Sequence, residues 1–230
     1  MKIPRIFHQI WLGNEPMPSK LSAWGKAWKS MHKNWEIWLW KRHTDKEIES
    51  NGVRFTVRHP EMLERACHLS QMSNILRYEL LEHFGGVYLD TDMEPIRTIE
   101  SLLSDISAFA PNMHTFRDGH VRLRLGCAIF GVVPGHPWAR DLVAKLSTIN
   151  PSVHGSLGSK YFAQVTGDHP EVMTFEPHVF YATDRTNKES YAIHHFSSKW
   201  WPGSFKLLEP KATASNCEDK CRTSSTPSSP

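Results

Sequence analysis

The segment from Ser70 to Asp92 constrains the fold of this chain more than any other part of the sequence. Its first half, SQMSNILRYELLEHF, repeats apolar residues at helical spacing, which predicts an amphipathic helix over residues 70–84. Gly85 and Gly86 are expected to end that helix, and the apolar run VYL behind them predicts a buried strand. A helix that leads through glycines into a buried strand is typical of α/β proteins.

The rest of the chain alternates between strand-like and helix-like segments. Short β-rich and aromatic runs predict strands over residues 3–12, 34–42, 106–112 and 125–135. Helical spacing predicts helices over residues 19–33, 136–148 and 159–167. This alternation predicts a three-layer α/β/α domain with a mostly parallel central sheet over residues 1–208. Residues 209–230 are rich in Ser, Thr and Pro and are expected to form a disordered tail.

Composition narrows the classes of partner. The 230 residues are 40% hydrophobic, which is enough for one real core, and 27 basic against 24 acidic residues leave a net charge of only +3. A nearly balanced charge gives no support to nucleic-acid binding. No run approaches the ~20 apolar residues of a membrane span. We therefore expect a soluble, cytoplasmic protein without a transmembrane segment, for which peripheral contact with the inner membrane surface stays open.

Two carboxylates, Asp90 and Asp92, follow the predicted strand at the edge where α/β sheets bind ligands. In extended chain, residues two apart point the same way, so both carboxylates could face one Mg²⁺ or Mn²⁺ ion. The alternative is that they are solvated residues opening a turn before Pro95. Two further features favour a site: Arg77 on the preceding helix and the His194–His195 pair near the end of the chain.

Three stretches together resemble the family 32 glycosyltransferases that carry a D-x-D motif: IPRIFHQIWLG, SNILRYELLEHFGGVYLDTDMEP and YAIHHFSSKWW. The resemblance implies a GT-A fold, the three-layer fold of nucleotide-diphospho-sugar transferases. It also implies a nucleotide-sugar donor, a divalent cation (Mn²⁺ or Mg²⁺) and a retaining mechanism. By the same resemblance Asp92 binds the metal directly, Asp90 contacts the ribose and the sugar, and Trp11 stacks on the nucleobase. The alternative role for Trp11 is that of a core residue at the end of a strand.

Arg77 is expected to hold either a donor oxygen or Asp90, and its alternative role is an ion pair on the helix surface with Glu82 or a neighbouring residue. Tyr88 is expected in the core or in the wall of the donor pocket. The family usually has Asp where this chain has Asn74, three residues before Arg77 on the same helical face. Asn keeps one acceptor but loses the charge, which predicts altered donor choice or weakened turnover.

Only one of the adjacent histidines can ligate the metal if their segment is extended, because the two side chains then point to opposite faces. The family pattern, in which an aromatic residue follows two positions later, favours His194 over His195. Lys199 and Trp200 are expected to cover the donor diphosphate as a closing C-terminal segment, with Lys199 adding a positive charge. Asp90, Asp92 and Arg77 are the predicted catalytic group.

These features predict a metal-dependent retaining transferase that moves a hexose from a UDP- or GDP-sugar to a glycan or glycolipid acceptor, as in polysaccharide biosynthesis. Acceptor contacts are expected from the polar, loop-like segments 112–126 and 153–162. One alternative is a catalytically weakened nucleotide-sugar or carbohydrate-binding module of the same fold. A less favoured alternative is a haloacid-dehalogenase-like phosphatase, in which the first Asp of D-x-D is the nucleophile.

Overall fold

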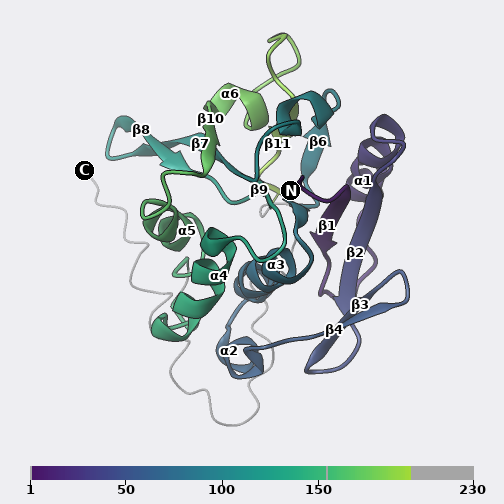
Figure 1. Ribbon diagram of the computed structural model, residues 1–230, viewed down its shortest axis with the longest axis vertical. Helices are drawn as coiled ribbons and strands as arrows, with labels where there is room; N and C mark the ends of the chain where they lie inside the picture. The colour runs from purple at the N-terminus through teal and green to yellow at the C-terminus, as the bar shows by residue number, and fades with distance from the viewer. Residues whose placement is uncertain (1, 154, 198–230) are drawn as a thin grey trace, which may run out of the picture.

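The computed structural model describes residues 2–153 and 155–197, and their centre is one large sheet (Figure 1). The strands of this sheet are β1 (Ile6–Ile10), β2 (Glu36–Arg42), β3 (Glu47–Ser50), β4 (Val53–Thr56), β5 (Gly86–Leu89), β7 (Ala108–Arg117), β8 (His120–Leu125), β9 (Ile129–Val132) and β10 (Met173–Phe175). A second, two-stranded sheet pairs β6 (Met93–Pro95) with β11 (Ala192–His194). The α-helices are α1 (Ser19–Met31), α2 (Pro60–Arg65), α3 (Leu69–Phe84), α4 (Pro137–Ala144), α5 (Ser159–Thr166) and α6 (Pro177–Phe180), and short 3-10 turns lie at Glu100–Leu103 and Lys145–Thr148.

The large sheet has the order β10-β7-β9-β5-β1-β2-β3-β4, with β8 beside β7. Strand β1 is parallel to both β2 and β5, and β7 is parallel to β10, while β9 runs antiparallel between β5 and β7. Since β5 and β7 both oppose β9, they run in the same direction as each other. The central strands are therefore mostly parallel, as the sequence predicted, with β9 as the reversed member.

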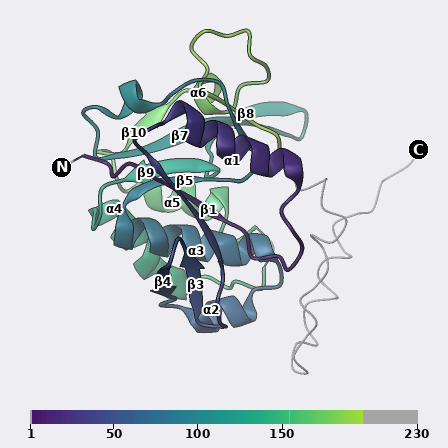
Figure 2. The same ribbon diagram turned by 90° about the vertical axis from the view of Figure 1, so that its right-hand side faces the viewer.

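Helices cover both faces of this sheet (Figure 2). One apolar core joins α2, α3, α4 and α5 to the sheet, and a second joins α1 and α6 to the opposite face. Strand β5 shows how the two cores are separated, because Tyr88 belongs to the first while Val87 and Leu89 belong to the second. The three-layer arrangement predicted from the sequence is confirmed.

The junction between α3 and β5 explains the glycine pair. Gly85 and Gly86 have φ angles of 65° and 91°, which side chains other than glycine rarely adopt. A Cβ on Gly85 would lie 2.6 Å from Cδ of Pro134, and one on Gly86 would lie 2.7 Å from the carbonyl oxygen of Ile6. The glycines thus end the helix abruptly and let β5 pack closely beside β1.

One predicted segment has a different structure. The polar stretch 112–126 was expected as a loop, but its residues 112–125 form most of the β7–β8 hairpin, which turns at Asp118 and Gly119. Both turn residues have positive φ, 53° and 77°, as the tight turn of a two-residue hairpin requires. The alternation of apolar and basic residues in β8 is the strand signal that the polar composition concealed.

Three predictions from the sequence fall outside the described residues: the roles of Lys199 and Trp200, and the tail at 209–230. Among the helices that the structure describes, none is long and apolar enough to span a membrane.

Candidate active site

The D-x-D motif lies in a turn directly after β5. The amide of Asp90 donates to the carbonyl of Ala128 at 2.7 Å, which extends the pairing with β9, and the amide of Met93 donates to the carbonyl of Asp90 at 3.1 Å. The expected extended geometry for Asp90 and Asp92 is therefore wrong, because residues 90–93 form a turn between β5 and β6. The turn still brings both carboxylates to the same side.

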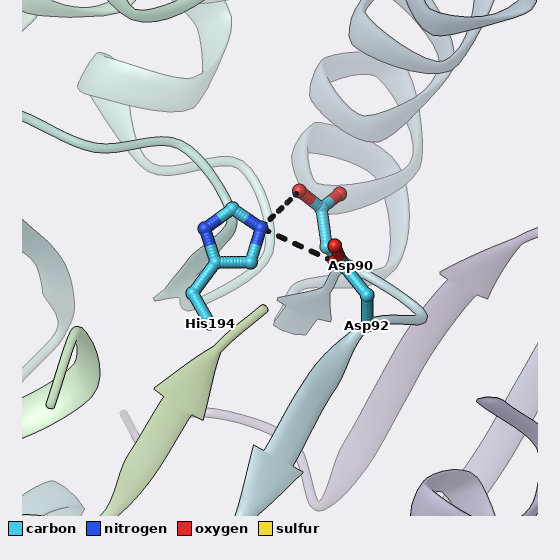
Figure 3. A group of neighbouring side chains, drawn as sticks. All are labelled: Asp90, Asp92 and His194. Atoms are coloured by element: carbon cyan, nitrogen blue, oxygen red, sulfur yellow. Dashed lines mark ion pairs between the residues drawn. The ribbon is translucent and has the colours of Figure 1, made fainter. Parts of the chain in front are cut away.

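Strand β11 brings a histidine to these carboxylates. It pairs antiparallel with β6, so that His194 lies opposite Met93, one residue beyond Asp92. Nε2 of His194 lies 3.2 Å from Oδ1 of Asp92 and 3.8 Å from Oδ2 of Asp90 (Figure 3). His194, which is about a hundred positions from the D-x-D motif in the sequence, thus forms a cluster with its two carboxylates.

Asp90 is held by two neighbours. The hydroxyl of Tyr88 donates to its Oδ1 at 2.6 Å, and Nη2 of Arg77 lies 3.2 Å from the same oxygen. Burial raises the pKa of the Asp90 carboxyl, and the nearby Arg77 guanidinium opposes that rise without cancelling it. The other oxygen, Oδ2, faces His194.

Asp92 has a different electrostatic setting. Burial disfavours its charge, but His194 and the backbone amide of Ser197, which donates to Oδ2 at 2.6 Å, outweigh burial and hold the pKa of Asp92 below its ordinary value. Asp92 is therefore the more readily ionised of the two carboxyls. Its neighbour in sequence, His195, points elsewhere: its Nε2 is 2.6 Å from Oε2 of Glu94, and its ring stacks on Trp24 at 4.3 Å.

Arg77 is a buried counter-ion rather than a surface residue. Only 5% of it is exposed, and besides the pair with Asp90 it donates to the carbonyl of Cys127 at 2.6 Å and to that of Ser73 at 3.3 Å. Its guanidinium lies 4.2 Å from the centre of the Tyr88 ring. The alternative pairing with Glu82 is wrong, because Glu82 pairs with Arg58.

The cluster faces a cavity of about 460 Å³. Its lining combines aromatic and apolar side chains from the end of β1 and from α1 with the polar cluster. The lining residues include Trp11, Leu12, Leu21, Trp24, Ser73, Arg77, Tyr88, Asp90, Asp92, His194, His195 and Phe196. Trp11 is half-buried, and its ring nitrogen donates to the carbonyl of Glu15 at 2.9 Å. Tyr88 has both of the roles considered for it, since it is 2% exposed and also lines the cavity.

Asn74 lies on α3, three residues before Arg77. In the described part of the chain it is not among the cavity's lining residues, and its amide nitrogen lies 3.8 Å from the position that a Cβ on Gly158 would occupy. It therefore faces the loop that precedes α5, one turn of α3 away from Arg77. Its role in donor choice stays a prediction.

The donor set fits a divalent cation. One carboxylate oxygen from Asp90, one from Asp92 and a ring nitrogen of His194 all lie within 4.8 Å of one another. Two anionic oxygens and one imidazole nitrogen on one side of an open cavity would leave coordination positions for ligand oxygens. The sequence predicted these three residues as the ligands, and the structure brings them together.

Comparison with known proteins identifies the region that carries this cluster. Residues 18–108 match the family described as the glycosyltransferase sugar-binding region containing the DXD motif. This part of the chain is therefore similar to the sugar-binding region of DXD glycosyltransferases. It contains both aspartates, Arg77 and Tyr88, whereas His194 lies beyond its end.

The chain is also similar to curated proteins of Schizosaccharomyces pombe. Inositol phosphoceramide mannosyltransferase 3 is 29% identical over 130 residues, which are 51% of this chain and 34% of the relative. Inositol phosphoceramide mannosyltransferase 1 is 26% identical over 152 residues, 65% of this chain and 44% of the relative. The chain thus spans between a third and a half of the length of these two proteins.

Solved glycosyltransferases share the fold around the DXD region. The structural alignment with the PaToxG glycosyltransferase covers 74% of this chain and 70% of that protein's chain, with a TM-score of 0.53 and 13% sequence identity. The alignment with a glycosyltransferase involved in the glycosylation of the major capsid of PBCV-1 covers 86% of this chain and 97% of that protein's chain. Its TM-score is 0.50 and the sequence identity is 13%. The predicted GT-A fold is confirmed.

Sequence reasoning missed several groups around the DXD motif. The backbone carbonyl of Cys127 and the amide of Ser197 both bind members of the cluster, but backbone groups leave no signal in a sequence. Ser73 contacts Tyr88 through their hydroxyls at 3.3 Å. Its position one helical turn before Arg77 was the available clue.

Proposed function

We propose that this chain is a metal-dependent glycosyltransferase that moves a hexose from a nucleotide-sugar donor to a glycan or lipid-linked acceptor. The observation that carries the proposal is the convergence of Asp90, Asp92 and His194 on the wall of the cavity. The family match and the fold support the reaction class. Since the solved structures that share the fold are glycosyltransferases, we favour a transferase over a haloacid-dehalogenase-like phosphatase.

The cavity's lining suits both parts of a nucleotide sugar. Trp11, one of its aromatic residues, offers a face for base stacking worth about 1–3 kcal/mol. The carboxylate and imidazole groups of the lining would hold Mn²⁺ or Mg²⁺ against the donor diphosphate. When bound, that cation would neutralise the charge that develops on the leaving diphosphate. The imidazole nitrogen favours Mn²⁺ over Mg²⁺, which prefers all-oxygen coordination.

The protein's own groups fix the two carboxylates in place. Tyr88 and Arg77 bind Oδ1 of Asp90, which leaves Oδ2 directed at His194. Ser197 binds Oδ2 of Asp92, which leaves Oδ1 directed at the same histidine. Each carboxylate thus has one oxygen occupied by protein donors and one available, so the site is preorganised for a ligand between them.

The donor sugar, acceptor and stereochemistry are the finer parts of the proposal. The curated relatives are named as mannosyltransferases of inositol phosphoceramide, which makes GDP-mannose and a lipid-linked acceptor the first candidates. Retention of the anomeric configuration follows from the family resemblance. It is tested by following the anomeric proton of the product by NMR.

The decisive experiment is calorimetric titration of the protein with GDP-mannose, UDP-glucose, UDP-galactose and UDP-N-acetylhexosamines, with and without Mn²⁺. We expect Asp92→Ala to remove the Mn²⁺-dependent part of donor binding, while Asp105→Ala, which removes an exposed carboxylate, leaves it unchanged. Unchanged donor affinity in Asp92→Ala would overturn the site. The alternative of a nucleotide-sugar-binding module would be favoured by tight Mn²⁺-dependent donor binding without donor hydrolysis or sugar transfer, in both the unmodified protein and the Asn74→Asp variant.

A further inference from the structure

The β7–β8 hairpin extends away from the body of the protein (Figure 1, upper left). Its register pairs Phe116 with Val121 and His114 with Leu123. Directly opposed residues share a face of an antiparallel pair, so these four side chains lie on one face of the hairpin. The neighbouring pairs, Thr115 with Arg122 and Met113 with Arg124, lie on the other.

The first of these faces is apolar and open to solvent. Phe116 is 76% exposed, Val121 is 66% exposed and Leu123 is 54% exposed, the three largest values among the exposed large hydrophobic residues of the described chain. Towards the base of the hairpin the same face continues into Leu125, which packs partly on the core beside α3, α4 and α5. The outer half of the hairpin therefore presents an apolar surface that the described residues do not cover.

The second face carries positive charge. Arg122 and Arg124 alternate with the apolar residues of β8, and both are exposed. Segment 112–125 contains three arginines and one aspartate. An apolar face backed by long cationic side chains suits the boundary of an anionic bilayer, because arginines can reach the phosphates while the apolar groups enter the headgroup region.

The hairpin is joined directly to the candidate active site. Two residues after β8 ends, the carbonyl of Cys127 accepts a hydrogen bond from Arg77, and the next carbonyl, that of Ala128, accepts the amide of Asp90. Gly126, the one residue between β8 and Cys127, is itself held by a hydrogen bond from its amide to the carbonyl of Pro111 at 2.8 Å. A surface that holds the hairpin would therefore also fix the orientation of the cavity.

We propose that the β7–β8 hairpin docks the protein on an anionic phospholipid surface, with Phe116, Val121 and Leu123 in the headgroup region and Arg122 and Arg124 at the phosphates. Docking itself does not depend on the reaction. The further consequence, that the cavity meets an acceptor anchored in the same bilayer, rests on the proposed function.

The test is co-sedimentation of the full chain with two kinds of vesicle, phosphatidylcholine alone and phosphatidylcholine with about 30 mol% phosphatidylserine. The anionic lipid supplies the negative surface potential that attracts basic side chains. We expect binding to the mixed vesicles that weakens with salt. Phe116→Glu should weaken it about tenfold, the loss expected for one buried apolar side chain. Arg122→Gln and Arg124→Gln should each weaken it about fivefold.

Met31→Glu is the matched control, because it places the same charge on an exposed apolar residue of α1. Circular dichroism checks that each variant is folded, and donor hydrolysis in solution should be unchanged in the hairpin variants, which separates failure of docking from failure of the proposed function. No binding to mixed vesicles, or equal binding of Phe116→Glu and Met31→Glu, would overturn the proposal. Concentration-dependent self-association abolished by Phe116→Glu, without vesicle binding, would identify a second copy of the chain as the occupant instead.

Discussion

Arg77 and Asp90 form the contact on which the geometry of the candidate site depends most, and Arg77→Met tests it. The arginine is 5% exposed, and the side chain of Asp90 is 25% exposed towards the cavity. Removing one member of a buried ion pair typically costs about 3–5 kcal/mol. Because Asp90 retains some access to solvent, we expect the lower end, about 3 kcal/mol. The unpaired carbonyl of Cys127 adds about 1 kcal/mol.

The assay is urea unfolding followed by circular dichroism, with a chelator present so that no metal contributes to stability. A double-mutant cycle with Asp90→Asn isolates the interaction, and the double variant should cost about 2 kcal/mol less than the sum of the two single variants. Strict additivity, or a loss below about 1 kcal/mol for Arg77→Met, would refute the assignment of Arg77 as the buried counter-ion of Asp90.

The pH dependence of the same variant has a definite sign. Burial already raises the pKa of Asp90, and loss of Arg77 removes the main group that opposes this rise. A carboxyl whose folded pKa is raised binds protons more tightly in the folded state, so stability falls as the pH rises through that pKa. The deficit of Arg77→Met relative to the wild type should therefore be smallest in acid and grow towards neutral pH.

Arg58→Met is the matched control. Arg58 also pairs with a glutamate of α3, Glu82, but its side chain is 39% exposed, so loss of this pair should cost less than about 1 kcal/mol.

Two further predictions concern the frame of the site. Burial lowers the pKa of His8 to about 3, whereas the pKa of this histidine in the unfolded chain is near 6.5. Between pH 7 and pH 5 the unfolded chain therefore takes up a proton that the folded chain does not, which should lower the free energy of unfolding by about 2 kcal/mol. The His8→Gln variant should lack this pH-dependent loss. Gly85→Ala should cost about 2–3 kcal/mol because φ is 65° and the new Cβ would meet the rigid ring of Pro134, whereas Gly52→Ala, also at positive φ but with open space around it, should cost less in the same unfolding assay.

The parts of the fold that the sequence predicted are those specified locally. The α3 helix, its glycine end and the buried strand β5 each follow from residues that are neighbours in the chain. The β7–β8 hairpin was not predicted because its apolar residues are exposed. The polar composition of the whole segment led to a loop prediction, although apolar and polar residues alternate along β8. The turn geometry of Asp90 and Asp92 was missed for another reason: it depends on hydrogen bonds to Ala128 and within the turn, which no periodicity encodes.

The position of His194 shows how the site combines local and distant information. Pairing of β11 with β6 places it opposite Met93, and in this register the side chain of His194 reaches Asp92 while that of His195 reaches Glu94. A shift of one residue would exchange them, because successive side chains of a strand point to opposite faces. His195 opposes such a shift, since it is held by Glu94 and stacks on Trp24. The histidine outside the carboxylate cluster thereby helps to specify the one inside it.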